Sequence, residues 1–336
     1  MEGENDLINV LSMDNISNRD VTAYYMDTIY KAAQEHGGAN RFDFSCLPEK
    51  DSIVIVSTVI EALKLLCKGY KKVGIWIQGV LPEESYLKHQ SKIRKKILEY
   101  IERVCLSRSV ILFMVSKEML RHYEKKYNLC LSDKTVIMPC FNTTIEPEAF
   151  DDSERYNKNI FTYVGSLAPW QCFTQTIELY SKLERVLRNS ELKIFTPDME
   201  AAECICKEKI KNYSIEYVSN SELQERLRHI KFGFILREDN VVNQVATPTK
   251  FSSYLANGVI PIFSKSIRSF DEESNAMEYV LRLECFDDAE KVIDFCNKGI
   301  DINQIQNEYR ELFDSYYSPN RYIRIIKSKF QELHLA

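Results

Sequence analysis

Short apolar segments alternate with longer amphipathic segments along almost all of this 336-residue chain, and this alternation constrains its fold more than any other feature. Several short segments are continuous runs of isoleucine, valine and phenylalanine. Such runs are typical of parallel strands that are covered by helices on both faces of a sheet. The pattern therefore predicts α/β domains made of repeated strand–helix units.

The alternation occurs twice. In the first half we expect strands at residues 7–12, 53–57, 73–78, 111–115 and 135–138, and helices at 21–35, 59–68, 87–104 and 117–127. A polar, acidic and turn-rich segment at 139–159 marks a domain boundary. After it we expect strands at 160–164, 192–195, 214–217, 232–236 and 260–263, and helices at 173–187, 201–210, 222–228 and 250–256. The tail at 302–335 is predicted to be helical, with a break near Pro319.

The predicted fold class is α/β, with two Rossmann-like, doubly wound parallel-sheet domains that face a cleft. We assign residues 1–145 to the first domain and 146–315 to the second. Ligands of such sheets bind beyond the carboxyl ends of the strands. Arg237, the helix start near Thr247 and the turn at Gly165 all follow predicted strands of the second domain, so we expect them at one edge.

Composition excludes several classes of protein. A net charge of −5 does not favour general nucleic-acid binding. The ten cysteines show no regular framework and no signal peptide precedes them, which predicts free thiols in a reducing cytoplasm. The Cys204-Ile205-Cys206 segment has no partner pair with metal-ligand spacing, so we expect no metal site. No apolar run reaches the ~18 residues that a membrane span needs.

Residues 237–263 (REDNVVNQVATPTKFSSYLANGVIPIF) contain the strongest functional signal. Thr247 is predicted to cap a helix whose first position is Pro248. A capping box would place Glu or Gln three residues after the cap, but Lys250 stands there. A cation at the positive end of a helix is unfavourable without a nearby anion. Lys250, Arg237, the Thr249 hydroxyl and free backbone N–H groups therefore predict a phosphate site, with solvated surface charges as the alternative.

Other residues of the second domain have a structural and a functional interpretation. Glu238 is either an ion-pair partner of Arg237 or a sugar contact. Asn240 and Asn243 are either turn formers or donor contacts. Trp170 and Gln171 either pack beneath a loop or line the ligand site. The interpretation for Gly165 is close approach of the backbone to a ligand, with Ser166 beside it.

The first domain contributes two further features. Glu83 and Glu84 follow the strand at 73–78, where a carboxylate could orient or deprotonate an acceptor hydroxyl, or equally cap the next helix. The helix at 87–104 is basic and amphipathic. It is either a solvated face or an attachment to an anionic membrane surface. Its basic and apolar residues are Lys88, Lys92, Arg94, Lys95, Lys96 and Arg103, and Ile93, Ile97, Leu98 and Ile101.

The chain resembles bacterial glycosyltransferases of the two-Rossmann GT-B architecture, most of all family four, which build capsular and O-antigen polysaccharides. In the second domain the resemblance is carried by residues 163–167 (YVGSL), 170–171 (WQ), 234–240 (FILREDN), 242–243 (VN), 247–251 (TPTKF) and 254–258 (YLANG). In the first domain it is carried by residues 76–79 (WIQG), 82–84 (PEE) and 115–119 (VSKEM).

The resemblance implies a nucleoside-diphosphate-sugar donor on the second domain and a saccharide acceptor, in this family often lipid-linked, on the first. It implies hexosyl transfer with retention, no metal or other cofactor, and a cytoplasmic location that includes the inner face of the membrane. Arg237 and Lys250 then offset the diphosphate charge. The helix at 316–336 is expected to return to the first domain.

Two positions depart from the family pattern. Ser253 stands where a glutamate usually bonds the donor ribose, and a hydroxyl cannot replace a bidentate carboxylate. Ser166 stands near the place of a usual cation. The sequence thus predicts a glycosyltransferase, with a non-catalytic nucleotide-sugar-binding or scaffold protein of a polysaccharide assembly complex as the alternative. An epimerase of the same architecture is a third interpretation.

Overall fold

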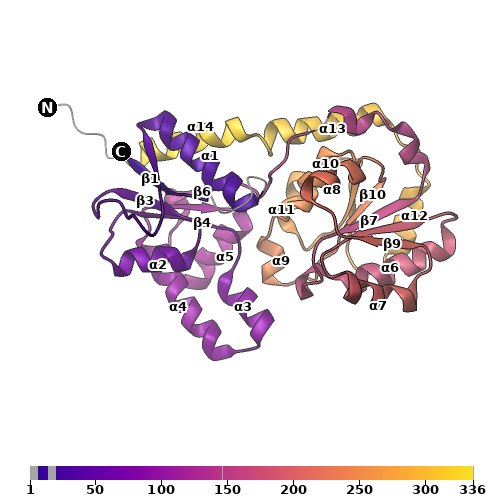
Figure 1. Ribbon diagram of the computed structural model, residues 1–336, viewed down its shortest axis with the longest axis horizontal. Coiled ribbons are helices and arrows are strands. Elements are labelled where there is room, and N and C mark those ends of the chain that lie inside the picture. Colours follow the sequence, from indigo (N-terminus) through magenta and orange to yellow (C-terminus); the bar gives the residue numbers. More distant parts are fainter. Residues whose placement is uncertain (1–6, 14–19, 146, 336) are drawn as a thin grey trace. The chain divides into compact units, whose positions relative to one another are not determined.

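The computed structural model describes residues 7–13, 20–145 and 147–335, which form two compact units (Figure 1). The first unit comprises residues 1–142, 245–247 and 318–336, and the second comprises 143–244 and 248–317. Each unit contains one six-stranded sheet in which all strand pairs are parallel. The predicted α/β class with two doubly wound parallel sheets is confirmed.

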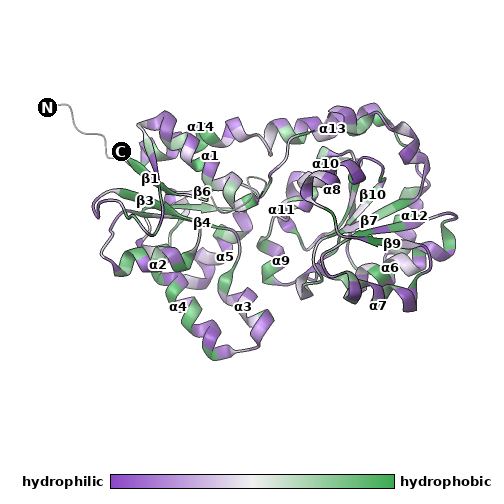
Figure 2. Ribbon diagram, in the orientation of Figure 1, coloured by the Kyte–Doolittle hydropathy of each residue, from purple (hydrophilic) through white to green (hydrophobic). Residues whose placement is uncertain are grey.

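In the first unit the strand order is β2-β1-β3-β4-β5-β6. The strands are β1 (Ile8–Leu11), β2 (Ala39–Phe42), β3 (Ile53–Val56), β4 (Val73–Ile77), β5 (Ile111–Met114) and β6 (Thr135–Ile137). Every residue of β1, β3, β4 and β5 is buried, as expected for strands covered on both faces. Figure 2 shows these central strands in green, as the hydrophobic layer of the unit.

The helices of the first unit are α1 (Val21–His36), α2 (Val59–Cys67), α3 (Leu81–His89), α4 (Lys92–Arg108), α5 (Lys117–Tyr127) and α14 (Pro319–Glu332), with a 3-10 turn at Ser132–Lys134. The prediction of a single helix at 87–104 is wrong, because two helices, α3 and α4, share this segment. Gln90 adopts a left-handed conformation with a φ of 52°, which ends α3. The Ser91 hydroxyl then accepts a hydrogen bond from the Arg94 N–H and starts α4.

The C-terminal helix α14 packs against α1 in the first unit, and Figure 1 shows the two side by side. Its buried side consists of Tyr322, Ile326 and Phe330. The His36 ring lies 5.7 Å from the Phe330 ring, and its Nε2 atom is 2.9 Å from the Leu335 carbonyl oxygen. The last segment of the chain therefore completes a layer begun by the first helix.

In the second unit the strand order is β12-β11-β10-β7-β8-β9. The strands are β7 (Ile160–Val164), β8 (Glu191–Phe195), β9 (Tyr213–Glu216), β10 (Phe232–Ile235), β11 (Ile260–Ser264) and β12 (Leu281–Leu283). The chain runs outward from β7 to β9 and then returns to the other side of β7 as β10. The order reverses between β7 and β10, and ligands of doubly wound sheets bind at such a point.

The helices of the second unit are α6 (Phe173–Val186), α7 (Met199–Lys209), α8 (Asn220–Leu227), α9 (Val241–Val245), α10 (Lys250–Ala256), α11 (Arg268–Glu273), α12 (Ala289–Cys296) and α13 (Ile302–Ser315). Three 3-10 turns lie at Pro147–Phe150, Ser153–Asn157 and Pro169–Gln171. Gly233 in β10 leaves room for the Tyr254 ring of α10, which any Cβ atom there would strike. This close packing fixes α10, and with it Lys250, against the strand that leads to Arg237.

No helix among the described residues combines the length and the apolar character that crossing a bilayer requires.

Candidate anion-binding site

The turn after β7 brings its backbone close to a lysine. Gly165 has a φ of 124°, and its N–H donates to the Phe195 carbonyl at 2.9 Å. A Cβ atom at Gly165 would lie 2.7 Å from Lys250 Nζ and 2.9 Å from Lys250 Cε. The backbone conformation favours glycine here, and a Cβ atom would also require the end of the Lys250 side chain to shift. The sequence-based expectation was close approach of this backbone to a ligand, and it stays a prediction. In the structure, the side chain that approaches Gly165 is Lys250 of α10.

Arg237 follows β10 at the same edge of the sheet and is 5% exposed. Its N–H donates to Ser264 Oγ at 2.8 Å, which fixes the backbone to the end of β11. Nη1 donates to the carbonyl oxygens of Leu236 at 2.8 Å and Gln171 at 3.2 Å. Nη2 donates to Gln171 Oε1 at 3.2 Å. The guanidinium is therefore held in one orientation by neutral oxygens, and burial lowers its pKa.

Lys250 is the first residue of α10 and is half-buried. Its ammonium group donates to Gln171 Oε1 and lies 4.9 Å from the centre of the Tyr163 ring. Burial holds the pKa of Lys250 well below its ordinary value, and the nearby charge of Arg237 lowers it further.

Two cations thus share one neutral amide oxygen. Within the described part of the chain, no carboxylate lies within ion-pair distance of Arg237 or Lys250. Burying like charges without an anion is costly, because desolvation and mutual repulsion add. An anion with several oxygen atoms would accept from both groups at once, through charge-assisted hydrogen bonds. The arrangement is suited to a phosphate or a diphosphate.

The prediction that Thr247 caps the helix before Lys250 is wrong. The cap position of α10 is Thr249, which makes no side-chain capping bond. Thr247 Oγ1 instead accepts from the Cys140 N–H at 2.9 Å, and Val245 O accepts from Ser116 Oγ at 2.6 Å. Residues 245–247 therefore belong to the first unit. Because α10 has only seven residues, side-chain cations and not a long helix dipole account for the charge of the site.

Three further candidates lie close to Gly165 or Lys250 along the chain. Ser166 Oγ is 3.5 Å from Gln171 Nε2, and Trp170 lies half-buried on the same 3-10 turn as Gln171. Ser253 lies three residues after Lys250 in α10 and is half-buried. Ser166, Trp170 and Gln171 thus lie in the segment between β7 and α6 that begins with Gly165, and Ser253 lies in α10 with Lys250.

Asn240, Asn243 and Glu238 form the turn that leads into α9. Asn240 Oδ1 accepts from the Asn243 N–H at 3.1 Å, and Asn243 Nδ2 donates to the Glu238 carbonyl at 3.0 Å. These contacts correspond to the turn-forming interpretation of both asparagines. The Glu238 side chain is exposed and accepts from Gln175 Nε2 at 3.3 Å, so it bonds an amide and not Arg237.

A pocket of about 450 Å³ lies beside Arg237, at the carboxyl ends of β10, β11 and β12. Sequence reasoning missed its residues from the last two strands. A usable signal was present, because Ser264-Lys265-Ser266 directly follows a predicted strand of the same sheet. Ser266 Oγ donates to the Arg237 carbonyl at 3.0 Å, and Lys265 pairs with Glu284 at 2.9 Å. The lining residues are Arg237, Glu238, Asp239, Ser264, Lys265, Ser266, Arg268, Glu284, Cys285 and Phe286.

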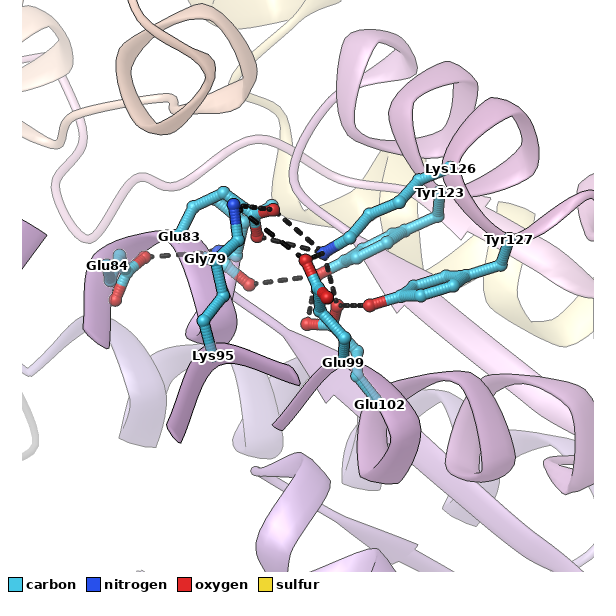
Figure 3. Close-up of polar contacts among 10 residues, drawn as sticks. Gly79, Glu83, Glu84, Lys95, Glu99, Glu102, Tyr123, Lys126 and Tyr127 are labelled. Atoms are coloured by element: carbon cyan, nitrogen blue, oxygen red, sulfur yellow. Dashed lines mark hydrogen bonds and ion pairs between the residues drawn. The ribbon is translucent and has the colours of Figure 1, made fainter. Parts of the chain in front are cut away.

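The two glutamates predicted in the first unit have separate roles (Figure 3). Glu84 Oε1 accepts from the Val80 N–H at 3.1 Å, which is the capping interpretation. Glu83 pairs with Lys126 at 2.8 Å and with Lys95 at 3.6 Å, and so ties α3 to α5 and α4.

Sequence reasoning did not identify Glu102, which lies beneath these ion pairs and is completely buried. Tyr127 Oη donates to Glu102 Oε2 at 2.6 Å, Tyr123 Oη lies 3.0 Å from Oε1, and Lys126 Nζ lies 3.4 Å from Oε2 (Figure 3). Burial raises the pKa of Glu102 to about 7. Among the described residues, no three histidine, cysteine or acidic side chains gather in a way that could hold a metal ion.

Comparisons with known proteins identify the fold. No protein-family model matches the sequence, and no curated protein matches it. Among solved structures, WaaG, a glycosyltransferase involved in lipopolysaccharide biosynthesis, is similar with a TM-score of 0.60 and 14% identity over 95% of this chain and 98% of that one. S. aureus TarM in complex with UDP is similar with a TM-score of 0.62 and 12% identity over 95% of this chain. This chain spans only 59% of the TarM chain.

A trehalose-phosphate synthase (UDP-forming) from Burkholderia vietnamiensis is also similar, with a TM-score of 0.59 and 10% identity over 94% of this chain and 78% of that one. Identities this low establish the fold alone. The chain has the GT-B fold.

Proposed function

We propose that this protein is a glycosyltransferase that moves a sugar from a nucleoside-diphosphate sugar to a saccharide acceptor. The observation that supports this most directly is the pair of cations, Arg237 and Lys250, which share a neutral oxygen at the switch point of the second sheet. The similar structures include TarM with UDP and a UDP-forming synthase, both of which handle a nucleoside diphosphate. The charge, position and fold therefore support a diphosphate as the ligand.

The geometry suggests how the site would assist transfer. Negative charge grows on the diphosphate as its bond to the sugar breaks, and oriented cations stabilise that charge most effectively. Arg237 is already fixed by two backbone carbonyls, so little reorganisation is needed. The donor oxygens would replace Gln171 Oε1 as the acceptor of both cations. Protein side chains then supply the positive charge, and the proposed reaction needs no bound metal.

The other donor contacts belong to the same proposal. Gly165 and Ser166 would approach the diphosphate through the backbone, and Trp170 would form a wall of the site. Glu238 would contact the sugar, and Ser253 would offer the ribose a single hydrogen bond. Further contacts are proposed for Asn240, Asn243 and Thr249.

We infer the finer assignments from the family resemblance. They are hexosyl transfer with retention, and a lipid-linked saccharide acceptor in capsular or O-antigen synthesis at the cytoplasmic face of the membrane. The first unit would take the acceptor. Glu83 is less well suited to act as a base, because Lys95 and Lys126 both occupy its carboxylate.

One observation favours a second function, that of a non-catalytic nucleotide-sugar-binding protein. Ser253 has no carboxylate to hold a ribose in a fixed position, so donor binding without efficient transfer would result. Binding and turnover measured on the same protein separate the two functions.

The test begins with calorimetry of UDP, GDP, CDP and dTDP. One nucleotide should bind the wild type, and Lys250→Ala should weaken it by about 1.5–3 kcal/mol. Lys207→Ala, which removes an exposed lysine from α7 of the same unit, is the control and should not change the affinity. If Lys250→Ala binds as tightly as the wild type, the phosphate site is elsewhere.

Turnover is then measured with a panel of nucleotide sugars and saccharide acceptors. Transfer supports the glycosyltransferase, and clear donor binding without any product supports the non-catalytic protein. Isomerised nucleotide sugar without transfer would indicate an epimerase.

A further inference from the structure

The outward side of α4 carries a stripe of apolar side chains. Ile93, Ile97 and Tyr100 are 75%, 56% and 72% exposed. At 100° per residue these three positions fall within about 60° of the helix circumference. The buried side of the helix is formed by other residues, which include Cys105 and Leu106. The stripe is therefore not part of the core, and Figure 2 shows α4 at the margin of the first unit.

Basic side chains flank this stripe on both sides. Lys92, Lys96 and Arg103 follow one side and Arg94 and Arg108 follow the other, within an arc of about 200°. Within the described part of the chain, Lys92, Lys96, Arg103 and Arg108 have no ion-pair partner, and Arg94 Nε bonds the neutral Ser85 Oγ at 2.9 Å.

The acidic residues of α4 lie outside that arc. Glu99 is 3.8 Å from both Lys95 and Lys126, and Glu102 is buried with Tyr127. One face of α4 thus carries five cations and no carboxylate, in a chain whose net charge is −5. This separation of charge points to an anionic partner with an apolar interior.

We propose that the face of α4 formed by Ile93, Ile97 and Tyr100 with its flanking cations docks on an anionic lipid bilayer. Interfacial helices have this composition, with apolar side chains entering the headgroup boundary and lysine and arginine contacting acidic lipids. Tyrosine is common at that depth. A second copy of this chain does not fit the face, because a symmetric contact would place five cations against five.

The inference extends the proposed function by naming the surface at which a lipid-linked acceptor would be met. Vesicle binding needs neither donor nor turnover, so it can succeed or fail independently of transferase activity. None of the five basic residues or three apolar residues belongs to the anion-binding site, so variants of this face should still bind nucleotide.

The test is co-sedimentation with vesicles of phosphatidylcholine, alone or mixed with phosphatidylglycerol. The wild type should bind only the anionic vesicles and dissociate at about 1 M salt. The triple variant Lys92→Gln, Lys96→Gln, Arg103→Gln should bind about 100-fold more weakly. The control triple Lys50→Gln, Arg188→Gln, Lys207→Gln removes the same charge from exposed positions elsewhere and should bind like the wild type.

The apolar stripe is tested separately. Ile93→Ser with Ile97→Ser keeps every charge and should bind about tenfold more weakly. Val186→Ser is the control, because Val186 is 58% exposed on α6. Tyr100→Trp should show a blue shift of its fluorescence on anionic vesicles, which reports insertion directly.

Three results would overturn the proposal. They are equal binding to neutral and anionic vesicles, equal binding by the two charge triples, and an unshifted Tyr100→Trp spectrum on vesicles. A wild-type dimer that Ile93→Ser with Ile97→Ser dissociates, without any vesicle binding, would identify a second copy as the partner instead.

Discussion

Gln171 is the residue that joins the two cations of the proposed site. Its Oε1 atom accepts from both Arg237 and Lys250. A carboxylate in the same place would neutralise the two cations and stabilise the fold, yet an amide stands there. An amide satisfies the donors without cancelling their charge, so an anionic ligand can still be bound strongly. The neutral residue therefore fits a binding site better than a structural ion pair.

We predict that Gln171→Glu, which is nearly isosteric, raises the stability of the second unit by about 1–3 kcal/mol and weakens nucleoside-diphosphate binding at least 100-fold. The added carboxylate would pair with Arg237 and Lys250 and repel the ligand. Thermal unfolding and calorimetry measure the two effects. Gln331→Glu, at an exposed position of α14, adds the same charge and is the control. Undiminished nucleotide affinity in Gln171→Glu would contradict the assignment of the site.

Substitution of two glycines separates the effect of displacing Lys250 from the effect of backbone strain. Gly165 has a φ of 124°, and a Cβ atom added there would meet Lys250. Gly69 has a φ of 94°, and a Cβ atom added there would have no neighbour within 4 Å. We predict that Gly165→Ala and Gly69→Ala each lose about 1–2 kcal/mol of stability, because alanine rarely adopts a positive φ. Only Gly165→Ala should also lose nucleotide affinity. Equal affinity in both variants would show that Lys250 moves aside freely.

At the scale of the element, the sequence predicts strands well when both of their faces are buried. The strands β3, β5, β7 and β10 were expected because continuous apolar runs produce them. The strands β2 and β12 were missed because they are short edge strands in which polar residues interrupt the apolar run, with Ala-Asn-Arg-Phe and Leu-Arg-Leu as their sequences. The other two edge strands, β6 and β9, were predicted. An edge strand needs only one neighbour, so its apolar signal is weak.

Helix ends were harder to predict, because they depend on contacts with distant segments as well as on the local sequence. The break between α3 and α4 has no glycine or proline, and depends on Gln90 adopting a left-handed conformation. Two threonines flank Pro248, and the bond from Cys140 to Thr247 decides which of them caps α10. Such a contact between distant segments cannot be read from the local pattern. The sequence predicted that Arg237, Lys250 and Gly165 lie at one edge of the sheet, as they do, whereas the bridging position of Gln171 Oε1 was not predicted.

The helices α4 and α5 share a buried polar cluster whose charge should depend on pH. Burial raises the pKa of Glu102 to about 7, so the folded protein holds a proton on this group that the unfolded chain releases at lower pH. This contribution to stability is complete below the unfolded pKa of about 4.3 and is lost as the pH rises through about 7.

We therefore predict that the free energy of unfolding of the wild type falls by about 1–3 kcal/mol between about pH 5 and pH 8, relative to Glu102→Gln. Denaturation followed by Trp76 fluorescence in a Trp170→Phe background reports on the first unit, because Trp76 is buried in β4. Glu208→Gln, at an exposed position, is the control and should follow the wild type. Parallel curves for the wild type and Glu102→Gln would mean that Glu102 stays ionised in the fold.

At the scale of the whole molecule, neither unit is a single stretch of chain. Residues 245–247 join the first unit between two segments of the second, and α14 joins it after α13. The sequence indicates a domain boundary where polar residues accumulate, at 139–159. It has no local signal that residues 245–247 pack in the first unit while the residues on either side pack in the second. This short segment matters for the site, since only Pro248 and Thr249 separate it from Lys250, and Ser116 and Cys140 hold it by hydrogen bonds.

The return of α14 gives a prediction about the stability of the first unit. Phe330 is completely buried against α1, whereas Ile325 on the same helix is 36% exposed. We predict that Phe330→Ala costs about 3–5 kcal/mol, because it removes a large core side chain and leaves a cavity, and that Ile325→Ala costs much less. Hydrogen exchange should rise in α1 and in the strands of the first unit. Slow exchange should persist in β7 and β10, since their core residues Phe161, Phe232 and Phe234 pack among themselves with ring centroids 5.1 and 5.5 Å apart. Equal acceleration in both sheets would instead show that the two units unfold as one cooperative body.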